Sequence, residues 1–305
     1  MAAQMNIPEK IALISSFAGY GRCSITEALP VISAMKVQAC PVPTAIFSNH
    51  TGFSANYMFD LTGEMPAYLA QWERLALQFD GIYCGFLENK GQIETISAFI
   101  RDQKERRKTD CHEPGLPGTR PPVVLIDPVM GDHGKLYRTV SPDYCEALKD
   151  FLSCADMITP NITESCLLTG TPCRESGWDT EELKKLCIKL HAMGPDKIVI
   201  TGLRATSADS RDLILNFTSE RDTRNGRLSF HTDRRPSAGP GYHGTGDIFA
   251  AILAADAVKG RAFFPSVQKA AAFVSECIQA SSALGIPETD GVCLENRLGL
   301  LTQEK

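Results

Sequence analysis

The sequence lacks the features of several large protein classes. None of its 305 residues fall in an apolar run of about 18 residues, so no membrane-spanning helix is predicted. Residues 1–8 have neither the charge cluster nor the apolar stretch of a secretion signal. The net charge of −5 gives no general attraction to nucleic acid or to an anionic membrane. We therefore expect a cytoplasmic protein that binds neither.

Common metal and nucleotide motifs are also missing. The 11 cysteines include no C-x-x-C pair, which favours reduced thiols over a zinc site or a disulfide framework. Gly134-Lys135 is followed by Leu136, so there is no Walker A loop, and the segment 19–21 lacks the third glycine of a dinucleotide fingerprint. Any ATP must be bound in another way.

Short apolar, β-branched runs alternate with longer segments of helical period, which is typical of an α/β protein. We expect a central, mostly parallel sheet with helices on both faces. The expected strands are 11–15, 38–47, 81–85, 123–127, 157–159 and 197–201. The expected helices are 24–36, 64–79, 89–107, 141–153, 179–193, 246–260 and 264–284.

We find no internal repeat and no long linker, so residues 1–305 are expected to form a single domain in which 1–8 is a flexible tail. The segment 101–122 is rich in Arg, Lys and Pro and is predicted to be a surface loop. The segment 211–232 indicates a hairpin, because Asn225-Gly226 suits a primed two-residue turn.

The strongest local pattern is the glycine-rich run 239–247, which ends in Gly244-Thr245-Gly246-Asp247 and is followed by an apolar helix. Amides at a helix start have no intrahelical partner, and together with the helix dipole they bind anions. Asp247 could accept a proton from an attacking hydroxyl while the amides of 244–246 neutralise a transferring phosphoryl group. The alternative is a glycine-rich turn in which an acidic residue is simply favoured in the first helical turn.

Four further polar residues follow expected strands. Asp127 and Asp132 could hold a magnesium or monovalent cation on ATP oxygens, or could form a local turn. Asn161 and Glu164 have the spacing of a helix capping box, which is an equally good reading of that pair.

Gly-Thr-Gly-Asp near the end of an α/β chain of this size resembles the ribokinase-like superfamily of small-molecule kinases. Within it, the chain is similar to the vitamin B6 (pyridoxal/pyridoxamine) kinases. The similarity is carried by the blocks 47–52 (Phe-Ser-Asn-His-Thr-Gly), 127–132 (Asp-Pro-Val-Met-Gly-Asp), 158–164 (Ile-Thr-Pro-Asn-Ile-Thr-Glu) and 193–201 (Met-Gly-Pro-Asp-Lys-Ile-Val-Ile-Thr).

The resemblance implies phosphorylation of a B6 vitamer by ATP with Mg²⁺, with K⁺ as a further cation and a homodimeric assembly. It places Asp127, Asp132, Tyr137, Asn161 and Thr201 by the nucleotide. Asp127 and Glu164 would serve the metal. Ser16, His50, Thr51 and Phe86 would surround the acceptor ring.

Two departures concern the acceptor. Phe86 stands where many relatives have Tyr, and Ser15 stands where they have Gln. Hydroxymethylpyrimidine, another flat ring with a hydroxymethyl group, therefore stays open as the acceptor, as does a non-catalytic binding protein on the same scaffold. The segment 233–243 is a possible lid, with Arg234 and Arg235 either near phosphate or simply solvated.

Overall fold

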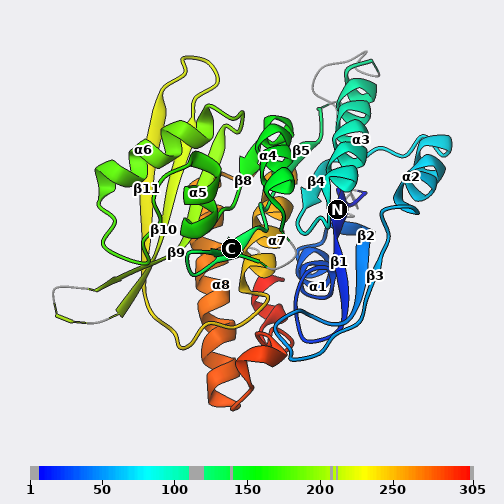
Figure 1. Cartoon of the computed structure of the whole chain (residues 1–305). Helices are drawn as coiled ribbons and strands as arrows, with labels where there is room; N and C mark the ends of the chain where they lie inside the picture. The colour runs from blue at the N-terminus through cyan, green and yellow to red at the C-terminus, as the bar shows by residue number, and fades with distance from the viewer. Residues whose placement is uncertain (1–6, 110–119, 138–139, 207–208, 211, 303–305) are drawn as a thin grey trace, which may run out of the picture.

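The computed structural model describes residues 7–109, 120–137, 140–206, 209–210 and 212–302. Its main feature is one nine-stranded sheet in the order β11-β10-β9-β8-β5-β4-β1-β2-β3 (Figure 1). The strands are β1 (Lys10–Tyr20), β2 (Gln38–Asn49), β3 (Met58–Asp60), β4 (Gly81–Cys84), β5 (Val123–Ile126), β8 (Met157–Ile158), β9 (Lys197–Thr206), β10 (Asp212–Arg221) and β11 (Leu228–Pro236). The six strands from β9 to β2 pair in parallel, and antiparallel pairs lie at both edges. A separate small sheet joins β6 (Gly131–Asp132) to β7 (Lys135–Leu136).

Helices cover both faces of this sheet. One face carries α1 (Ile25–Ala34), α7 (Thr245–Val258) and α8 (Phe263–Ala283). The other carries α2 (Met65–Arg74), α3 (Lys90–Thr109), α4 (Pro142–Phe151), α5 (Ile162–Thr169) and α6 (Thr180–His191). Three short 3-10 helices complete the described chain: η1 (Leu152–Cys154), η2 (Glu288–Asp290) and η3 (Leu298–Leu301). The predicted α/β architecture, with helices on both faces, is confirmed.

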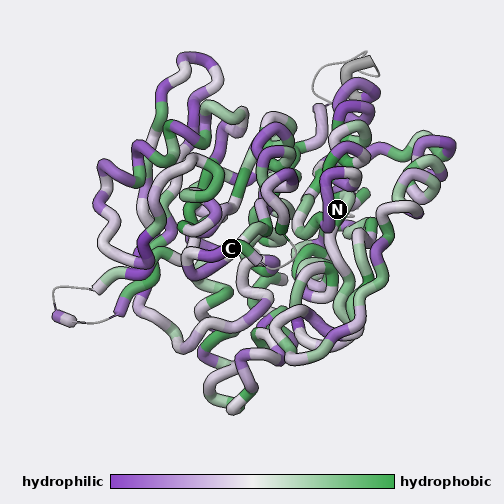
Figure 2. Tube along the Cα trace, viewed as in Figure 1, coloured by the Kyte–Doolittle hydropathy of each residue, from purple (hydrophilic) through white to green (hydrophobic). Residues whose placement is uncertain are grey.

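Alternation along the strands explains the two cores. In β1, Ile11 and Leu13 point to the core under α1, α7 and α8, whereas Ala12 and Ile14 point to the opposite core. Central strands of a parallel sheet are buried on both faces, so their sequences are continuously apolar. Figure 2 shows this as hydrophobic colouring along the middle of the molecule. Among the described residues, no helix combines the length and hydropathy needed to cross a bilayer.

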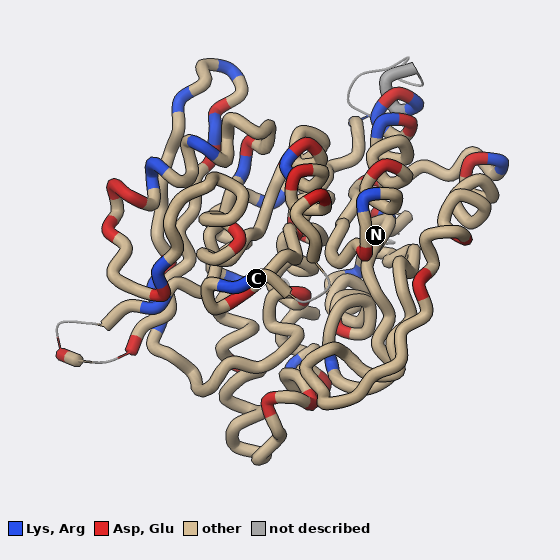
Figure 3. The backbone as a smooth tube through the Cα atoms, in the orientation of Figure 1, with Lys and Arg blue, Asp and Glu red and all other residues tan. Residues whose placement is uncertain are grey.

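The helix pair α7 and α8 carries few charges, and Figure 3 shows both helices mostly in tan. One exception is the ion pair between Lys269 of α8 and Asp256 of α7, whose Nζ and Oδ1 atoms are 2.8 Å apart. The Asp256 side chain is 5% exposed, and the Lys269 side chain is 42% exposed. The pair therefore joins the helix that begins at Gly244 to its neighbour.

The surface-loop interpretation of 101–122 was wrong for residues 101–109, which form the last turns of α3. Charged residues such as Arg, Lys and Glu are good helix formers, and the Arg106 and Asp102 side chains pair four residues apart at 2.6 Å. Residues 110–119 lie outside the described residues, as do residues 1–6 of the expected tail.

The predicted hairpin is confirmed as β10 and β11, but the two-residue turn was wrong. Arg221 pairs with Leu228, which leaves a six-residue connection between the strands. The Asp222 carboxylate accepts hydrogen bonds from Arg224 N (2.9 Å) and Asn225 Nδ2 (2.9 Å), so a side chain organises the turn. Of the Asn-Gly pair, Gly226 alone has a positive φ.

Several elements were not expected. Helix α5 has eight residues and strands β3, β6 and β7 have two or three each, too short for a periodic pattern to be visible. Strand β1 continues to Tyr20, so Ser16 lies inside it rather than after it. A register irregularity between Ser15 and Phe17 accompanies this polar stretch of the strand.

Replacing Lys269 by Met should destabilise the protein, because the buried Asp256 carboxylate loses its charged partner. The lysine is partly exposed, so we expect a loss of about 1–3 kcal/mol, below the cost of breaking a fully buried pair. Urea denaturation measures the free energy of unfolding. The control is Lys149→Met, whose partner Glu146 is 72% exposed and which should change stability by less than about 1 kcal/mol. Equal effects of the two substitutions would contradict the prediction.

Candidate active site

The start of α7 is shaped by Gly244, its N-cap, which has a φ of 84°. A Cβ atom at this position would lie 2.5 Å from the Arg22 carbonyl oxygen, so both the backbone conformation and the close approach require glycine. The first intrahelical bond runs from Ile248 N–H to Gly244 O at 3.1 Å. The amides of Thr245, Gly246 and Asp247 therefore have no partner within the helix.

Asp247 lies in this first turn and is partly buried. Its Oδ2 accepts a hydrogen bond from the Ser24 amide at 2.7 Å. Burial raises the pKa of Asp247 to about 6, although the bond from Ser24 opposes the shift. A carboxylate with a pKa just below neutrality is suited to accept a proton at physiological pH. The Thr245 hydroxyl donates to Tyr242 O at 3.2 Å and so helps to fix the turn.

Asp127 follows β5 at the carboxyl edge of the sheet. Burial raises its pKa to about 7, a hydrogen bond from the Thr159 hydroxyl at 2.8 Å opposes this, and the charge of Asp247 raises it further. The last effect indicates that the two carboxylates, predicted from separate blocks, lie near each other. This edge is where ligands bind to open α/β sheets.

Asn161 and Glu164 form a complete capping box at the start of α5. Asn161 Oδ1 accepts from Glu164 N at 2.9 Å, and Glu164 Oε2 accepts from Asn161 N at 2.9 Å. Glu164 Oε1 also accepts from Met130 N at 3.1 Å, and Asn161 Nδ2 donates to Gly131 O at 2.8 Å. The prediction that Asn161 and Glu164 form a helix capping box is thus confirmed. Burial, followed by the charge of Asp127, raises the pKa of Glu164.

The buried carboxylates at this edge of the sheet are candidate ligands for a metal ion. Among the described residues, no three His, Cys, Asp or Glu side chains gather as metal ligands. Mg²⁺ in nucleotide sites takes one or two carboxylates and completes its shell with phosphate and water. Asp127 suits a direct ligand, because its Oδ1 accepts from Thr159 while its Oδ2 has no donor among the residues that the structure describes. The Glu164 carboxylate already accepts hydrogen bonds from two backbone amides, so it suits a contact to the metal through a water molecule.

The remaining predicted nucleotide residues lie at the same edge and are less enclosed. Asp132 is exposed in β6, where its Oδ1 accepts from His133 N at 2.7 Å. Tyr137 is 43% exposed. Thr201 is half-buried in β9 and pairs with Asn161 through a parallel bridge, which brings it beside the capping box.

On the acceptor side, Ser16 is buried, and its hydroxyl lies 3.0 Å from the Ser24 hydroxyl. The Ser15 hydroxyl accepts from Phe86 N at 3.1 Å and thereby orients the backbone at Phe86. The Phe86 ring packs edge-on against Phe47, with centroids 5.8 Å apart. Ser16, Phe86 and the start of α7 are thus linked through Ser24 and Ser15.

His50 is buried, and both of its ring nitrogens are occupied. Nε2 donates to Thr289 O at 2.7 Å, which leaves Nδ1 to accept from Gly52 N at 3.1 Å. The ring therefore has no free nitrogen to offer a ligand. The Phe53 ring and the exposed His243 ring pack against it at a tilt, with centroids 4.8 and 4.3 Å from that of His50, and the neighbouring Thr51 is exposed. The contact with His243 brings the block around residue 50 next to Gly244.

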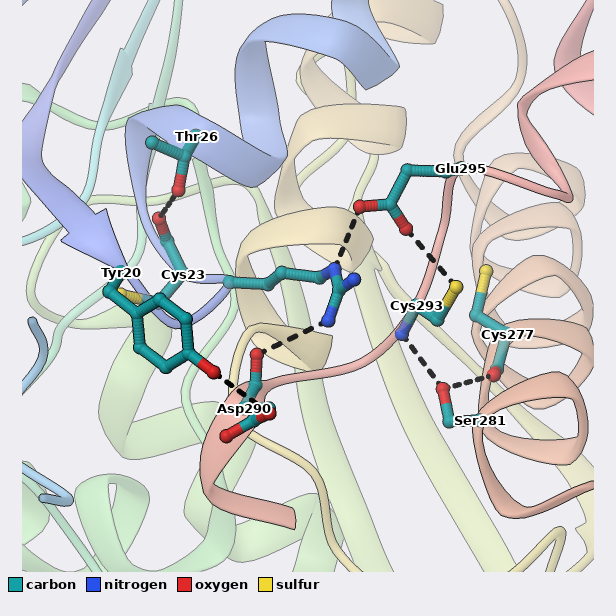
Figure 4. A network of polar contacts seen from close by, with 9 residues as sticks. Tyr20, Cys23, Thr26, Cys277, Ser281, Asp290, Cys293 and Glu295 are labelled. Carbon is teal, nitrogen blue, oxygen red and sulfur yellow. Dashed lines mark hydrogen bonds and ion pairs between the residues drawn. The ribbon is translucent and has the colours of Figure 1, made fainter. Parts of the chain in front are cut away.

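Sequence reasoning missed the segment 288–295, which we call the C-terminal strap. It holds three parts of the site at once, through Thr289 to His50, through Val292 N to His243 O at 3.0 Å, and through Asp290 O to Arg22 N at 3.0 Å. Arg22 Nε donates to Glu295 Oε1 at 2.8 Å, and Arg22 Nη1 donates to Asp290 O at 3.4 Å. Figure 4 shows the Tyr20 hydroxyl directed toward Asp290, to which it donates at 3.1 Å. No local sequence motif in the C-terminal strap predicts these long-range contacts.

The possible lid over 233–243 is wrong for residues 233–236, which belong to β11, and for Tyr242, which is buried with its hydroxyl donating to Ile286 O at 3.2 Å. For residues 237–241 the lid stays a prediction. Arg235 is held by two bonds to Asp233 and one to Gln268 O, so it does not point freely to a phosphate. Arg234 is exposed, as the solvated alternative expected.

These groups together could catalyse phosphoryl transfer to a hydroxyl. The start of α7 supplies a base and amides without helical partners, and the carboxyl edge of the sheet supplies acids whose charge a metal would neutralise. Glu27 also belongs to this region, since a Cβ at Gly244 would lie 3.1 Å from its Cγ. The spacing of Ser24 and Glu27, which matches a capping box, was the one sequence signal for that residue.

The sequence matches the phosphomethylpyrimidine kinase family over residues 25–291. Pyridoxal kinase from Sus scrofa is 32% identical over 223 residues, which cover 68% of this chain and 62% of that protein. The chain thus spans less than two thirds of the length of that relative. The pyridoxine/pyridoxal/pyridoxamine kinase of Bordetella pertussis is 27% identical and is matched over 92% of this chain and 93% of its own.

A solved structure from Bacteroides thetaiotaomicron, of a protein named as a phosphomethylpyrimidine kinase and crystallised with pyridoxal, superposes with a TM-score of 0.83. It is 31% identical, and the match covers 97% of this chain and 96% of that one. The likeness confirms the predicted ribokinase-like α/β fold. On the match over residues 25–291, the chain belongs to the phosphomethylpyrimidine kinase family.

Proposed function

We propose that the protein transfers the γ-phosphate of ATP to the 5'-hydroxymethyl group of a vitamin B6 vitamer: pyridoxal, pyridoxamine or pyridoxine. The observation that carries the proposal is Asp247, a partly buried carboxyl with a pKa raised to about 6, placed among amides at the start of α7 that have no partner within the helix. The Bacteroides protein crystallised with pyridoxal and the B6 kinases of pig and Bordetella support the choice of acceptor.

In the proposed reaction, Asp247 takes the proton of the acceptor hydroxyl as its oxygen attacks the γ-phosphorus in line. The amides of 244–246 stabilise the charge on the transferring group. Asp127, and Glu164 through water, would hold Mg²⁺, which neutralises phosphate charge when bound. The nucleotide phosphates would be lined by Asp132, Tyr137, Asn161 and Thr201. K⁺ would be a further cation. The residues that would surround the acceptor ring are Ser16, His50, Thr51 and Phe86.

Three further proposals rest on the resemblance to B6 kinases and on the fold. Residues 1–305 form one kinase domain, which is supported by the gathering of nine strands in one sheet. The protein acts as a homodimer, and it acts in the cytoplasm.

Hydroxymethylpyrimidine is the second candidate acceptor. It is favoured by the family name and by Phe86, which has no hydroxyl to bond a B6 ring. Phe86 still presents an apolar ring that can stack on either heteroaromatic acceptor.

Replacing Asp247 by Asn should lower kcat by about 10²- to 10⁴-fold, because the amide cannot accept the proton. ATP affinity, measured by calorimetry, should stay within about threefold, since the amides of the turn remain. The control is Asp143→Asn, an acidic residue in the first turn of α4, which should leave kcat unchanged. Near-normal turnover of the Asp247 variant would show that Asp247 is not the base.

The pH dependence of kcat/KM should follow Asp247. The base is active when ionised, and its pKa is about 6, so activity should be constant between pH 7 and pH 8 and fall about tenfold per pH unit below pH 5.5. Initial rates of ADP release between pH 5 and pH 8, with saturating ATP and limiting acceptor, measure the profile. A rate that stays constant down to pH 5 would be incompatible with this base.

A coupled ADP-release assay with the three B6 vitamers and with hydroxymethylpyrimidine tests the acceptor. We expect kcat/KM for the best vitamer to exceed that for hydroxymethylpyrimidine by about tenfold or more, the scale set by a few pocket contacts. The reverse order would establish the second candidate. ADP release with none of the four acceptors would support a non-catalytic binding protein.

A further inference from the structure

Glu27 is the most unusual ionisable side chain outside the proposed chemistry. It lies in the first turn of α1 and is completely buried. Neither of its carboxyl oxygens has a hydrogen-bond partner within the described part of the chain. Buried polar groups in folded proteins are nearly always hydrogen-bonded, and an unpaired buried carboxylate is costly. A residue that is kept in this state calls for a physical reason.

The surroundings of Glu27 are those of the proposed base. Its Cγ packs against Gly244, and the ionisable groups that face it are Asp247 of α7, Arg22 and Cys23 before α1, Glu295 of the C-terminal strap, and Cys277 of α8. Burial raises the pKa of Glu27 to about 9, the charges of Asp247 and Glu295 add to the shift, and Arg22 opposes it. Glu27 is therefore uncharged at neutral pH, whereas Asp247 is ionised.

The same chain shows what a glutamate at this helix position otherwise does. In α5 and α6, the third helical residue is Glu164 or Glu182, and its carboxylate accepts the amide of the N-cap residue at 2.9 and 3.0 Å. Ser24 and Glu27 have the same spacing in α1. There, however, the Ser24 amide donates to Asp247, and the Ser24 hydroxyl is engaged with Ser16.

We propose that Glu27 is a positioning residue for Asp247: its buried carboxyl accepts no amide, which leaves the Ser24 amide to Asp247 and so holds that carboxylate at the start of α7. The inference rests on the proposed role of Asp247 as the base. An ionised Glu27 would be a second anion beside Asp247, since two close carboxylates disfavour joint ionisation. It would repel Asp247 and compete for the same amide. Ionisation of Glu27 at alkaline pH would thus displace the base.

Carbon-13 NMR of the labelled Asp247 carboxyl tests the coupling without any substrate. In the wild type, its signal should move between pH 6 and pH 7, as Asp247 and its neighbour Asp127 ionise, and in a second step near pH 9, as Glu27 ionises. In Glu27→Gln, the second step should disappear. If the glutamine variant does not fold, Glu27→Met serves instead, because it also cannot ionise and is apolar. A single step in the wild type, or a second step that persists in the variant, would overturn the proposal.

The kinetic test compares kcat/KM of Glu27→Gln with that of the wild type. Between pH 8 and pH 10, the ratio of variant to wild type should rise about tenfold, as the neutral fraction of a group with a pKa near 9 falls. The matched control is Glu182→Gln in α6, whose ratio should not vary with pH. If the ratio for Glu27→Gln does not change with pH, Glu27 serves packing only and the proposal is wrong. If the wild type phosphorylates no acceptor, the proposed function fails while the NMR titration still decides the role of Glu27.

Discussion

The hydrogen bond from the Ser24 amide to Asp247 joins residues 223 positions apart and fixes the geometry on which the rest of the site depends. Two backbone positions with a positive φ make it possible, and the one that is not glycine, Ser24, is strained. Ser24 has a φ of 55° although it is not glycine, and Gly244 has a φ of 84° at the start of α7. The missing side chain at Gly244 lets the Arg22 carbonyl approach, so the chain before α1 can reach Asp247. Strain of this kind persists when the surrounding structure over-determines it, as the helices and the C-terminal strap do here.

The acids of the site have different hydrogen-bond partners, and this separates their roles. Glu164 accepts two amides and is committed to the start of α5, whereas Asp127 accepts one hydroxyl and Asp247 one amide. Buried acids close to one another are unfavourable without a cation, and amides at a helix start are unfavourable without an anion. A magnesium–nucleotide complex satisfies both requirements at once, which gives the proposed kinase reaction a physical basis beyond the likeness to relatives.

The sequence predicted the elements that depend on local patterns. Central strands such as β4 and β5 are buried on both faces, so their apolar runs identified them within about one residue. It failed where local composition and tertiary context disagree. The charged composition of 101–122 favoured a surface loop that overlapped the expected helix 89–107, and the structure continues α3 to Thr109. The polar pair Ser15 and Ser16 obscured the second half of β1. At the site, the positions of Asp247 and Asp127 followed from their motifs. The occupied nitrogens of His50 did not, because their partners include Thr289, 239 residues away.

Helix α1 shows why a correct local pattern can still mislead. The spacing of Ser24 and Glu27 is that of the pairs that cap α5 and α6, and from sequence it favours the same reciprocal bonds. In the folded chain, the N-cap amide is taken by a carboxylate from α7, and the local partner is left buried and uncharged. A capping box stabilises a helix by satisfying its own first amides. Here the Ser24 amide donates to Asp247 of α7 and not to Glu27. Helix α1 therefore lacks one stabilising bond of a capping box, and that amide fixes the position of Asp247.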